Sequence, residues 1–132
     1  MLLTGQPAEA LAWIDKAFAL EPQDFRFVGY ALAIRCRAYQ ALGRYNEAIA
    51  ACQKAVAEGQ DSWGTHADLV AAYALKGETA KAQAEKTILL KQQPGMTIAD
   101  LTAMRASNDP AFLQQAETHV YTGLRKVGIP EK

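Results

Sequence analysis

The feature of the sequence that most constrains its fold is a repeat with a period of 34 residues. Gly43 and Ala48 recur as Gly77 and Ala82, and an incomplete copy begins at Gly5. A fixed period in this range is typical of proteins that stack helical hairpins, in which each unit covers the apolar face of its neighbour. Because such stacks usually serve as binding surfaces, the repeat indicates an interaction protein more readily than an enzyme.

The stretches between the repeat positions have the length and apolar spacing of amphipathic helices, and no segment has the pattern of a β-strand. Glycine follows several of these stretches, as expected for residues that end helices in the left-handed conformation. Short turns of this kind make neighbouring helices antiparallel. The sequence therefore predicts an all-α fold, with helices over residues 8–20, 24–42, 45–58, 63–76, 78–92, 98–105 and 110–127.

Charge and hydropathy exclude several classes of partner. The chain has 14 Lys and Arg residues against 14 Asp and Glu residues, so its net charge is zero. A general nucleic-acid binder or a protein of anionic membrane surfaces would carry a basic excess. No apolar run approaches the ~18 residues that a membrane-spanning helix needs. We therefore expect no nucleic-acid partner and no membrane partner.

The two cysteines, Cys36 and Cys52, fall on facing helices of one expected hairpin. The residues at the start of the chain do not form a signal peptide, so the expected compartment is the cytoplasm. Thiols remain reduced there, and we expect two buried cysteines that pack as small apolar side chains. A disulfide between them is the less favoured alternative.

The repeated positions also resemble a known family, the tetratricopeptide repeat. Its order of large, small, Tyr, Gly, Ala and terminal Pro residues is matched at Tyr39, Gly43, Tyr45, Ala48 and Ala55, and again at Leu69, Tyr73, Gly77, Ala82 and Pro94. The resemblance implies a single domain in which helical hairpins stack into a right-handed superhelix. Its parts would be a half repeat over 1–24, repeats over 25–60 and 61–95, and capping helices over 96–132.

The end of the chain carries a second resemblance. Residues 97–101, 108–112 and 121–131 look like the C-terminal ending of the repeat regions attached to bacterial class III adenylate and guanylate cyclases. Related repeat-containing winged-helix regulators end in a similar way. The resemblance implies that this chain is the C-terminal regulatory segment of a signalling protein. The half repeat at the N-terminus would then expose an apolar face, through which a homodimer could form.

In the tetratricopeptide family, the first helix of each pair lines a concave groove. The positions expected there, and therefore the candidate partner-binding residues, are Arg26, Tyr30, Arg37, Gln40, Ala67 and Ala71. The first four offer polar recognition of a protein or peptide, and Arg37 could hold a carboxylate or phosphate with two hydrogen bonds. The two alanines would let another backbone approach closely. An ordinary solvated helix face is the alternative interpretation of these residues.

The helix expected over 110–127 competes for the same groove. It could fold back into the groove or cap the last repeat, and capping is favoured because a terminal repeat needs a cover. Leu113, Val120 and Leu124 would then belong to the core. The sequence alone leaves open whether the groove is free or filled.

No group of residues predicts catalysis. Ser62 and Ser107 are placed as helix caps, and Ser62, His66 and Asp68 lie at one helix start, whereas a catalytic triad converges from different elements. His66 and the two cysteines lack a fourth zinc ligand. We therefore expect no cofactor, no metal and no enzymatic activity. The sequence predicts a non-catalytic interaction module, and the alternative is a regulatory segment of a nucleotide cyclase.

Overall fold

In the computed structural model, the first five helices pack against one another in chain order. The structure describes residues 6–20, 28–105 and 109–132, without the side chains of residues 19 and 20. Its first five helices are α1 (Pro7–Leu20), α2 (Val28–Ala41), α3 (Tyr45–Ala57), α4 (Trp63–Lys76) and α5 (Thr79–Gln92). The C-terminal part comprises α6 (Ile98–Arg105), α7 (Pro110–Ala116), the π-helical segment η2 (Glu117–Tyr121) and α8 (Thr122–Lys126). The predicted all-α class is confirmed for the described residues.

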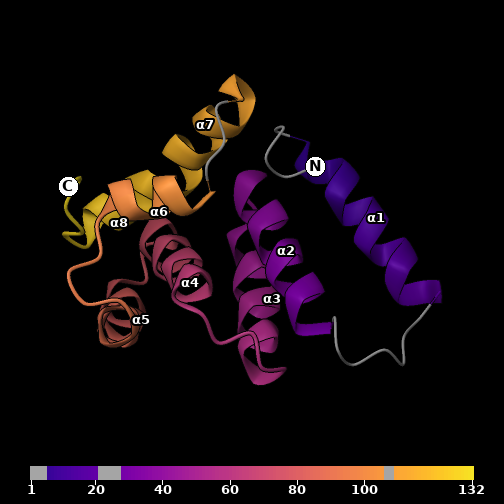
Figure 1. Cartoon of the computed structure of the whole chain (residues 1–132), viewed down its shortest axis with the longest axis horizontal. Coiled ribbons are helices and arrows are strands. Elements are labelled where there is room, and N and C mark those ends of the chain that lie inside the picture. Colours follow the sequence, from indigo (N-terminus) through magenta and orange to yellow (C-terminus); the bar gives the residue numbers. More distant parts are fainter. Residues whose placement is uncertain (1–5, 21–27, 106–108) are drawn as a thin grey trace.

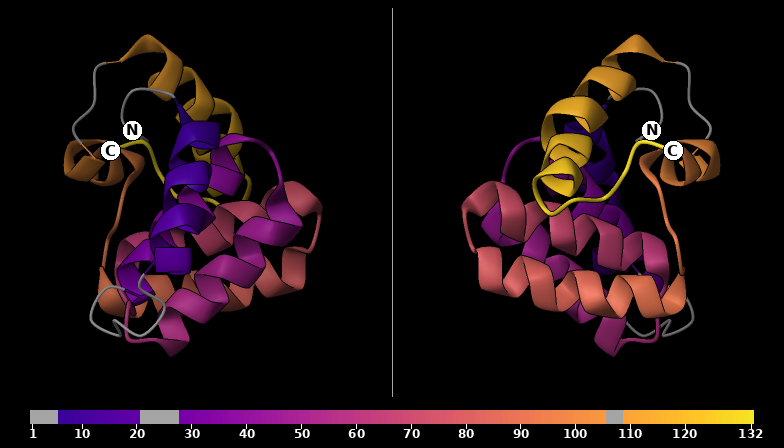
Figure 2. Two further views of the ribbon diagram at one scale, coloured as in Figure 1. Left: turned by 90° about the vertical axis from the view of Figure 1, so that its right-hand side faces the viewer. Right: turned by 90° about the vertical axis from the view of Figure 1, so that its left-hand side faces the viewer.

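Helices α2 and α3 form one hairpin and α4 and α5 a second, and α3 packs against α4 to join them. Helix α1 lies against α2 on the far side of the first hairpin (Figure 1). The continuous segment of α7, η2 and α8 crosses the stack and packs on α4 and α2 (Figure 2). The described helices therefore form two hairpins, flanked on one side by α1 and crossed by the C-terminal helix.

Glycines end the first helix of each hairpin, as the repeat predicts. Gly43 and Gly77 have φ angles of 74° and 85°, in the left-handed region where a side chain is strained. Each is followed by a bond that closes the turn: the N–H of Arg44 donates to the carbonyl of Tyr39, and that of Glu78 to the carbonyl of Tyr73. The 34-residue period is therefore a repetition of two helix-ending turns with the same geometry.

The core lies where α3, α4 and the C-terminal helix meet. Its largest fully buried apolar side chains are Leu69, Leu89, Met96, Leu101 and Leu124. Helix α4 is buried along most of its length, because α5 covers one face and the C-terminal helix covers another. No helix in the described part of the chain is both long and apolar enough to cross a bilayer.

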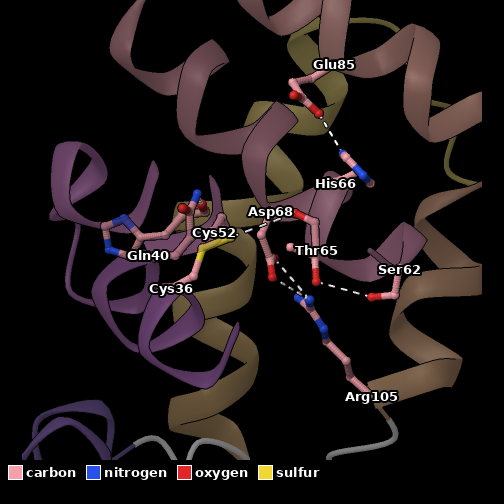
Figure 3. The surroundings of a disulfide bond; sticks show 10 residues. Cys36, Gln40, Cys52, Ser62, Thr65, His66, Asp68, Glu85 and Arg105 are labelled. Carbon is pink, nitrogen blue, oxygen red and sulfur yellow. Dashed lines mark hydrogen bonds and ion pairs between the residues drawn. A yellow bond between two sulfur atoms is a disulfide. The ribbon is translucent and has the colours of Figure 1, made fainter. Parts of the chain in front are cut away.

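Cys36 and Cys52 form a disulfide between α2 and α3, so the expectation of two reduced thiols is wrong. The facing positions in this hairpin bring their Cα atoms to 5.2 Å, within the range that a disulfide requires. Both residues are fully buried, as expected. The bond ties the two helices that carry the first complete repeat (Figure 3). The cytoplasmic location stays a prediction.

Candidate functional site

The predicted partner-binding residues divide into an exposed and a covered group. Tyr30 is 58% exposed and Arg37 is half-buried on α2, whereas Ala67 and Ala71 on α4 are fully buried. Gln40 has only 1% of its surface exposed. Arg26 lies outside the described residues. The expected binding surface is therefore limited to α2. The prediction that Ala67 and Ala71 on α4 contact a partner is wrong, because both are fully buried.

The C-terminal helix covers the alanines of α4. Gly123 lies so close to Ala71 that a Cβ atom at position 123 would be 2.7 Å from the Ala71 carbonyl oxygen. Val120 and Leu124 are buried in the same contact, as capping predicts, but Leu113 remains at the surface. The close approach that the alanines permit is thus used by the chain's own helix, and Ala67 and Ala71 are not open to a partner.

Gln40 fixes the C-terminal helix to α2. Its side-chain nitrogen donates to the backbone carbonyl of His119 at 2.7 Å. The ring Nδ1 of His119 is 2.7 Å from the hydroxyl of Tyr45, and burial lowers the pKa of this histidine. A neutral imidazole at this position can accept a hydrogen bond from the tyrosine hydroxyl. These contacts link η2 to the start of α3, so the side-chain nitrogen of Gln40 serves the fold.

Beside this contact lies a small hollow, which we call the recess, between α2, α4, α6 and the C-terminal helix. Its volume is about 30 Å³. Its lining comprises Arg37, Gln40, Ala41, Asp68, Arg105, Phe112, Gln115, Ala116 and Val120. The recess therefore brings two of the predicted residues, Arg37 and Gln40, next to charged residues that the sequence analysis did not place there.

Asp68 and Arg105 form a buried ion pair across the recess. The Arg105 Nη2 donates to both carboxylate oxygens of Asp68, at 3.0 and 2.9 Å. Figure 3 shows Arg105 reaching from α6 toward Asp68 on α4. A buried pair of this kind is costly to break, because removal of one partner leaves the other charge without compensation. It joins α4 to α6.

The sequence does not predict this pair, because its members are 37 residues apart. One signal was present: Asp68 is a carboxylate in the otherwise apolar run 67–74, apart from the hydroxyl of Tyr73. A charge in such a run is buried with its helix and needs a partner. Nothing in the spacing identifies Arg105 as that partner.

His66 is held between two carboxylates on the other side of α4. Its Nδ1 is 2.7 Å from Glu85 Oε2 and its Nε2 is 2.6 Å from Asp61 Oδ1, while Gln92 donates to the same Asp61 oxygen at 2.8 Å. Burial lowers the pKa of His66, but the hydrogen bonds to Glu85 and Asp61 outweigh it and raise this pKa above its ordinary value. The bond from His66 in turn lowers the pKa of Asp61. The His66 ring thus ties the loop before α4 to α5.

These contacts bear on the chemistry that the chain could perform. The Ser62 hydroxyl is 3.1 Å from that of Thr65, and both ring nitrogens of His66 are engaged by carboxylates, so the two residues do not form a nucleophile and base pair. Ser107 lies outside the described residues. Among the described residues, no three His, Cys, Asp or Glu side chains come together in a way that could hold a metal ion.

The residues at the end of the chain have structural roles. Arg125 forms ion pairs with Glu117 and Glu131, and these bonds raise the pKa of Arg125 and lower that of Glu131. The carbonyls of Pro130 and Glu131 accept from the first N–H groups of α6 at 2.9 Å. Ile129 is buried. The segment 121–131 therefore seals the end of the stack.

Comparison with known proteins adds no relative to these observations. No family model, curated protein or solved structure matches the chain. The functional interpretation rests on the residues and their geometry.

Proposed function

We propose that this chain is a non-catalytic interaction module that binds a segment of another protein along the exposed face of α2. The observation that carries the proposal is the state of Arg37. Its guanidinium is half-buried beside the recess, and it makes no hydrogen bond or ion pair with any other described residue. A charged group in that position gains from a partner that brings an acceptor.

The surroundings of Arg37 favour a macromolecular partner. Tyr30 lies two helical turns earlier on the same helix, at a spacing of seven residues, and is well exposed. Tyrosine and arginine are the residue types that most often dominate binding energy at protein interfaces. The resemblance to tetratricopeptide repeats supports the same role, because the groove of those proteins is lined by the equivalent helix.

The experiment introduces a photoreactive amino acid in place of Tyr30 in cells, with Lys91 on α5 as the matched control position. We expect a discrete protein adduct from position 30, and none of the same size from position 91. The isolated partner should bind the Arg37→Glu variant at least about tenfold more weakly, because a charge-assisted hydrogen bond is replaced by repulsion. Helicity by circular dichroism should be unchanged. An unchanged affinity would remove the α2 face from consideration.

A second role has its own supporting observation. Helix α1 buries Ala10 and Ile14 against α2, while Trp13 on its outer face is 61% exposed. An indole so exposed on a terminal helix suits contact with a further domain or with a second copy. We infer that the chain could serve as a regulatory segment of a signalling protein, such as a nucleotide cyclase, with the Trp13 face as the contact.

Two measurements test this second role. The reading frame upstream of Met1 should encode a cyclase or another signalling domain if the segment is regulatory; a stop codon directly upstream contradicts this. Light scattering over a range of concentrations tests self-association. A dimer that dissociates in Trp13→Ser supports contact through α1, and a monomer at every concentration argues against it.

A further inference from the structure

The recess beside α2 carries an excess of positive charge. Asp68 is already matched by Arg105, since both of its oxygens accept from one guanidinium nitrogen. Arg37 has no such match among the residues that the structure describes. Burial and, after it, the positive charge of Arg105 lower the pKa of Arg37, and the negative charge of Asp68 only partly offsets them. The three charged groups of the lining thus leave one positive charge without a counterion.

Two further polar atoms of the lining lack partners. Gln40 Oε1 and Arg105 Nε are buried and make no hydrogen bond with the described residues. The orientation of the Gln40 amide is fixed, because its nitrogen donates to the His119 carbonyl and its oxygen must therefore face the other way. The lining consequently offers one unmatched acceptor as well as unmatched donors. Buried polar atoms in folded proteins are normally paired.

The size of the recess limits what can enter it. A water molecule needs roughly 10–15 Å³ of such space, so the observed 30 Å³ holds about two oxygen-sized atoms. A carboxylate has two oxygens in one plane, which also matches the fork of a guanidinium. A phosphate has four oxygens in a tetrahedron, and two of them would have to remain outside the recess.

We propose that the recess binds a carboxylate of an extended peptide, with Arg37 donating to its oxygens and a neighbouring peptide N–H donating to Gln40 Oε1. The need for both an acceptor and a donor in the guest favours a peptide over a free small anion. This inference rests on the proposed interaction function and specifies the chemistry of its partner. An acidic side chain and a C-terminal carboxylate present the same group and fit equally.

The test is an NMR titration of the purified chain, observed at the side-chain Nε–Hε signal of Arg37. The probes are N-acetyl-glutamate methylamide, the matching glutamine compound, acetate and inorganic phosphate. We expect a saturable shift with the glutamate compound and none with the glutamine compound or phosphate. Acetate should bind several-fold more weakly, because it has no N–H for Gln40. Equal binding of acetate would overturn the peptide part of the proposal.

Two variants locate the binding. Arg37→Gln should weaken the glutamate compound by at least about tenfold. Arg44→Gln is the matched control, since Arg44 is on the surface and already forms an ion pair with Glu47 at 2.6 Å. Backbone signals near the recess report on binding in both variants.

Three results would overturn the carboxylate proposal: no saturation with the glutamate compound, an equal response to phosphate, or unchanged binding in Arg37→Gln. The probes require no partner protein, so this outcome is independent of the crosslinking experiment. Failure to find a partner at position 30 would leave carboxylate binding measurable. Failure of carboxylate binding would leave a partner on the α2 face possible through other contacts.

Discussion

The contact between the C-terminal helix and α4 can be tested by adding one methyl group. In Gly123→Ala, the new Cβ atom would lie 2.7 Å and 2.8 Å from the oxygen and Cα of Ala71. Ordinary contacts begin at 3.4 Å, so the two helices must separate by about 0.7 Å. The obstructing atoms are backbone atoms, which cannot rotate out of the way. The methyl group therefore acts on the packing of the whole C-terminal helix.

The expected loss of stability follows from two opposing effects. Overpacking of a core contact costs about 1–3 kcal/mol, and an obstruction by backbone places this case toward the upper end. Alanine is favoured over glycine within a helix by up to about 1 kcal/mol. The net expectation for Gly123→Ala is a loss of about 2 kcal/mol. In urea this corresponds to a midpoint lower by about 1 M.

Gly64→Ala is the matched control for this prediction. It makes the same chemical change within a helix, but its Cβ would meet the terminal methyl of Met104 at 3.0 Å. That flexible side chain can move, so we expect between no change and about 1 kcal/mol of added stability. Urea unfolding followed by circular dichroism at 222 nm measures both variants. Equal midpoints for the two would refute the contact between α8 and α4 on which the filled groove depends.

Three further predictions concern the other polar contacts. Asp68→Ala should lose about 3–5 kcal/mol of stability in urea unfolding. The double variant Asp68→Leu with Arg105→Met should recover most of this loss, because no buried charge is then left alone. Equal losses for the single and the double variant would contradict a buried ion pair. The pKa of His66 is raised in the folded state, so its contribution to stability is complete below the unfolded pKa of about 6.5. This contribution is lost as pH rises through the folded pKa. Thermal unfolding measured over a pH series should show this loss in the native chain but not in His66→Gln. Reduction of the bond between Cys36 and Cys52, which closes a loop with a separation of 16 residues, should lower stability by about 3 kcal/mol, and identical urea midpoints with and without reductant would count against the bond.

Features set by neighbouring residues could be predicted from the sequence. The helix over Ile98–Arg105 has the expected bounds, and Gly43 and Gly77 end their helices with positive φ angles. These features depend on local backbone preferences, which a single sequence records directly. The burial of Val120 and Leu124 was also predictable, because an amphipathic helix at the end of a stack has an apolar face to cover.

Features set by distant residues could not be predicted in the same way. The pairing of Asp68 with Arg105 depends on where α6 is placed against α4, and the sequence gives no measure of that placement. The covering of Ala67 and Ala71 has the same origin, since small residues permit close approach without naming the helix that makes it. The expectation of two reduced thiols was wrong for a different reason, because it followed from the expected compartment and not from the facing positions of the two cysteines.

The π-helical segment Glu117–Tyr121 alters how the C-terminal helix tolerates changes in length. A wide turn of this kind holds one residue more than an α-helical turn, so the faces before and after it keep the alignment of a helix that is one residue shorter. A deletion of one residue within this segment would convert the wide turn into an α-helical turn and leave α7 and α8 facing their present neighbours. The hydrogen bond from Gln40 to the His119 carbonyl would be lost. The same deletion within α8 would rotate the residues after it by about 100° and turn their apolar side chains away from α4.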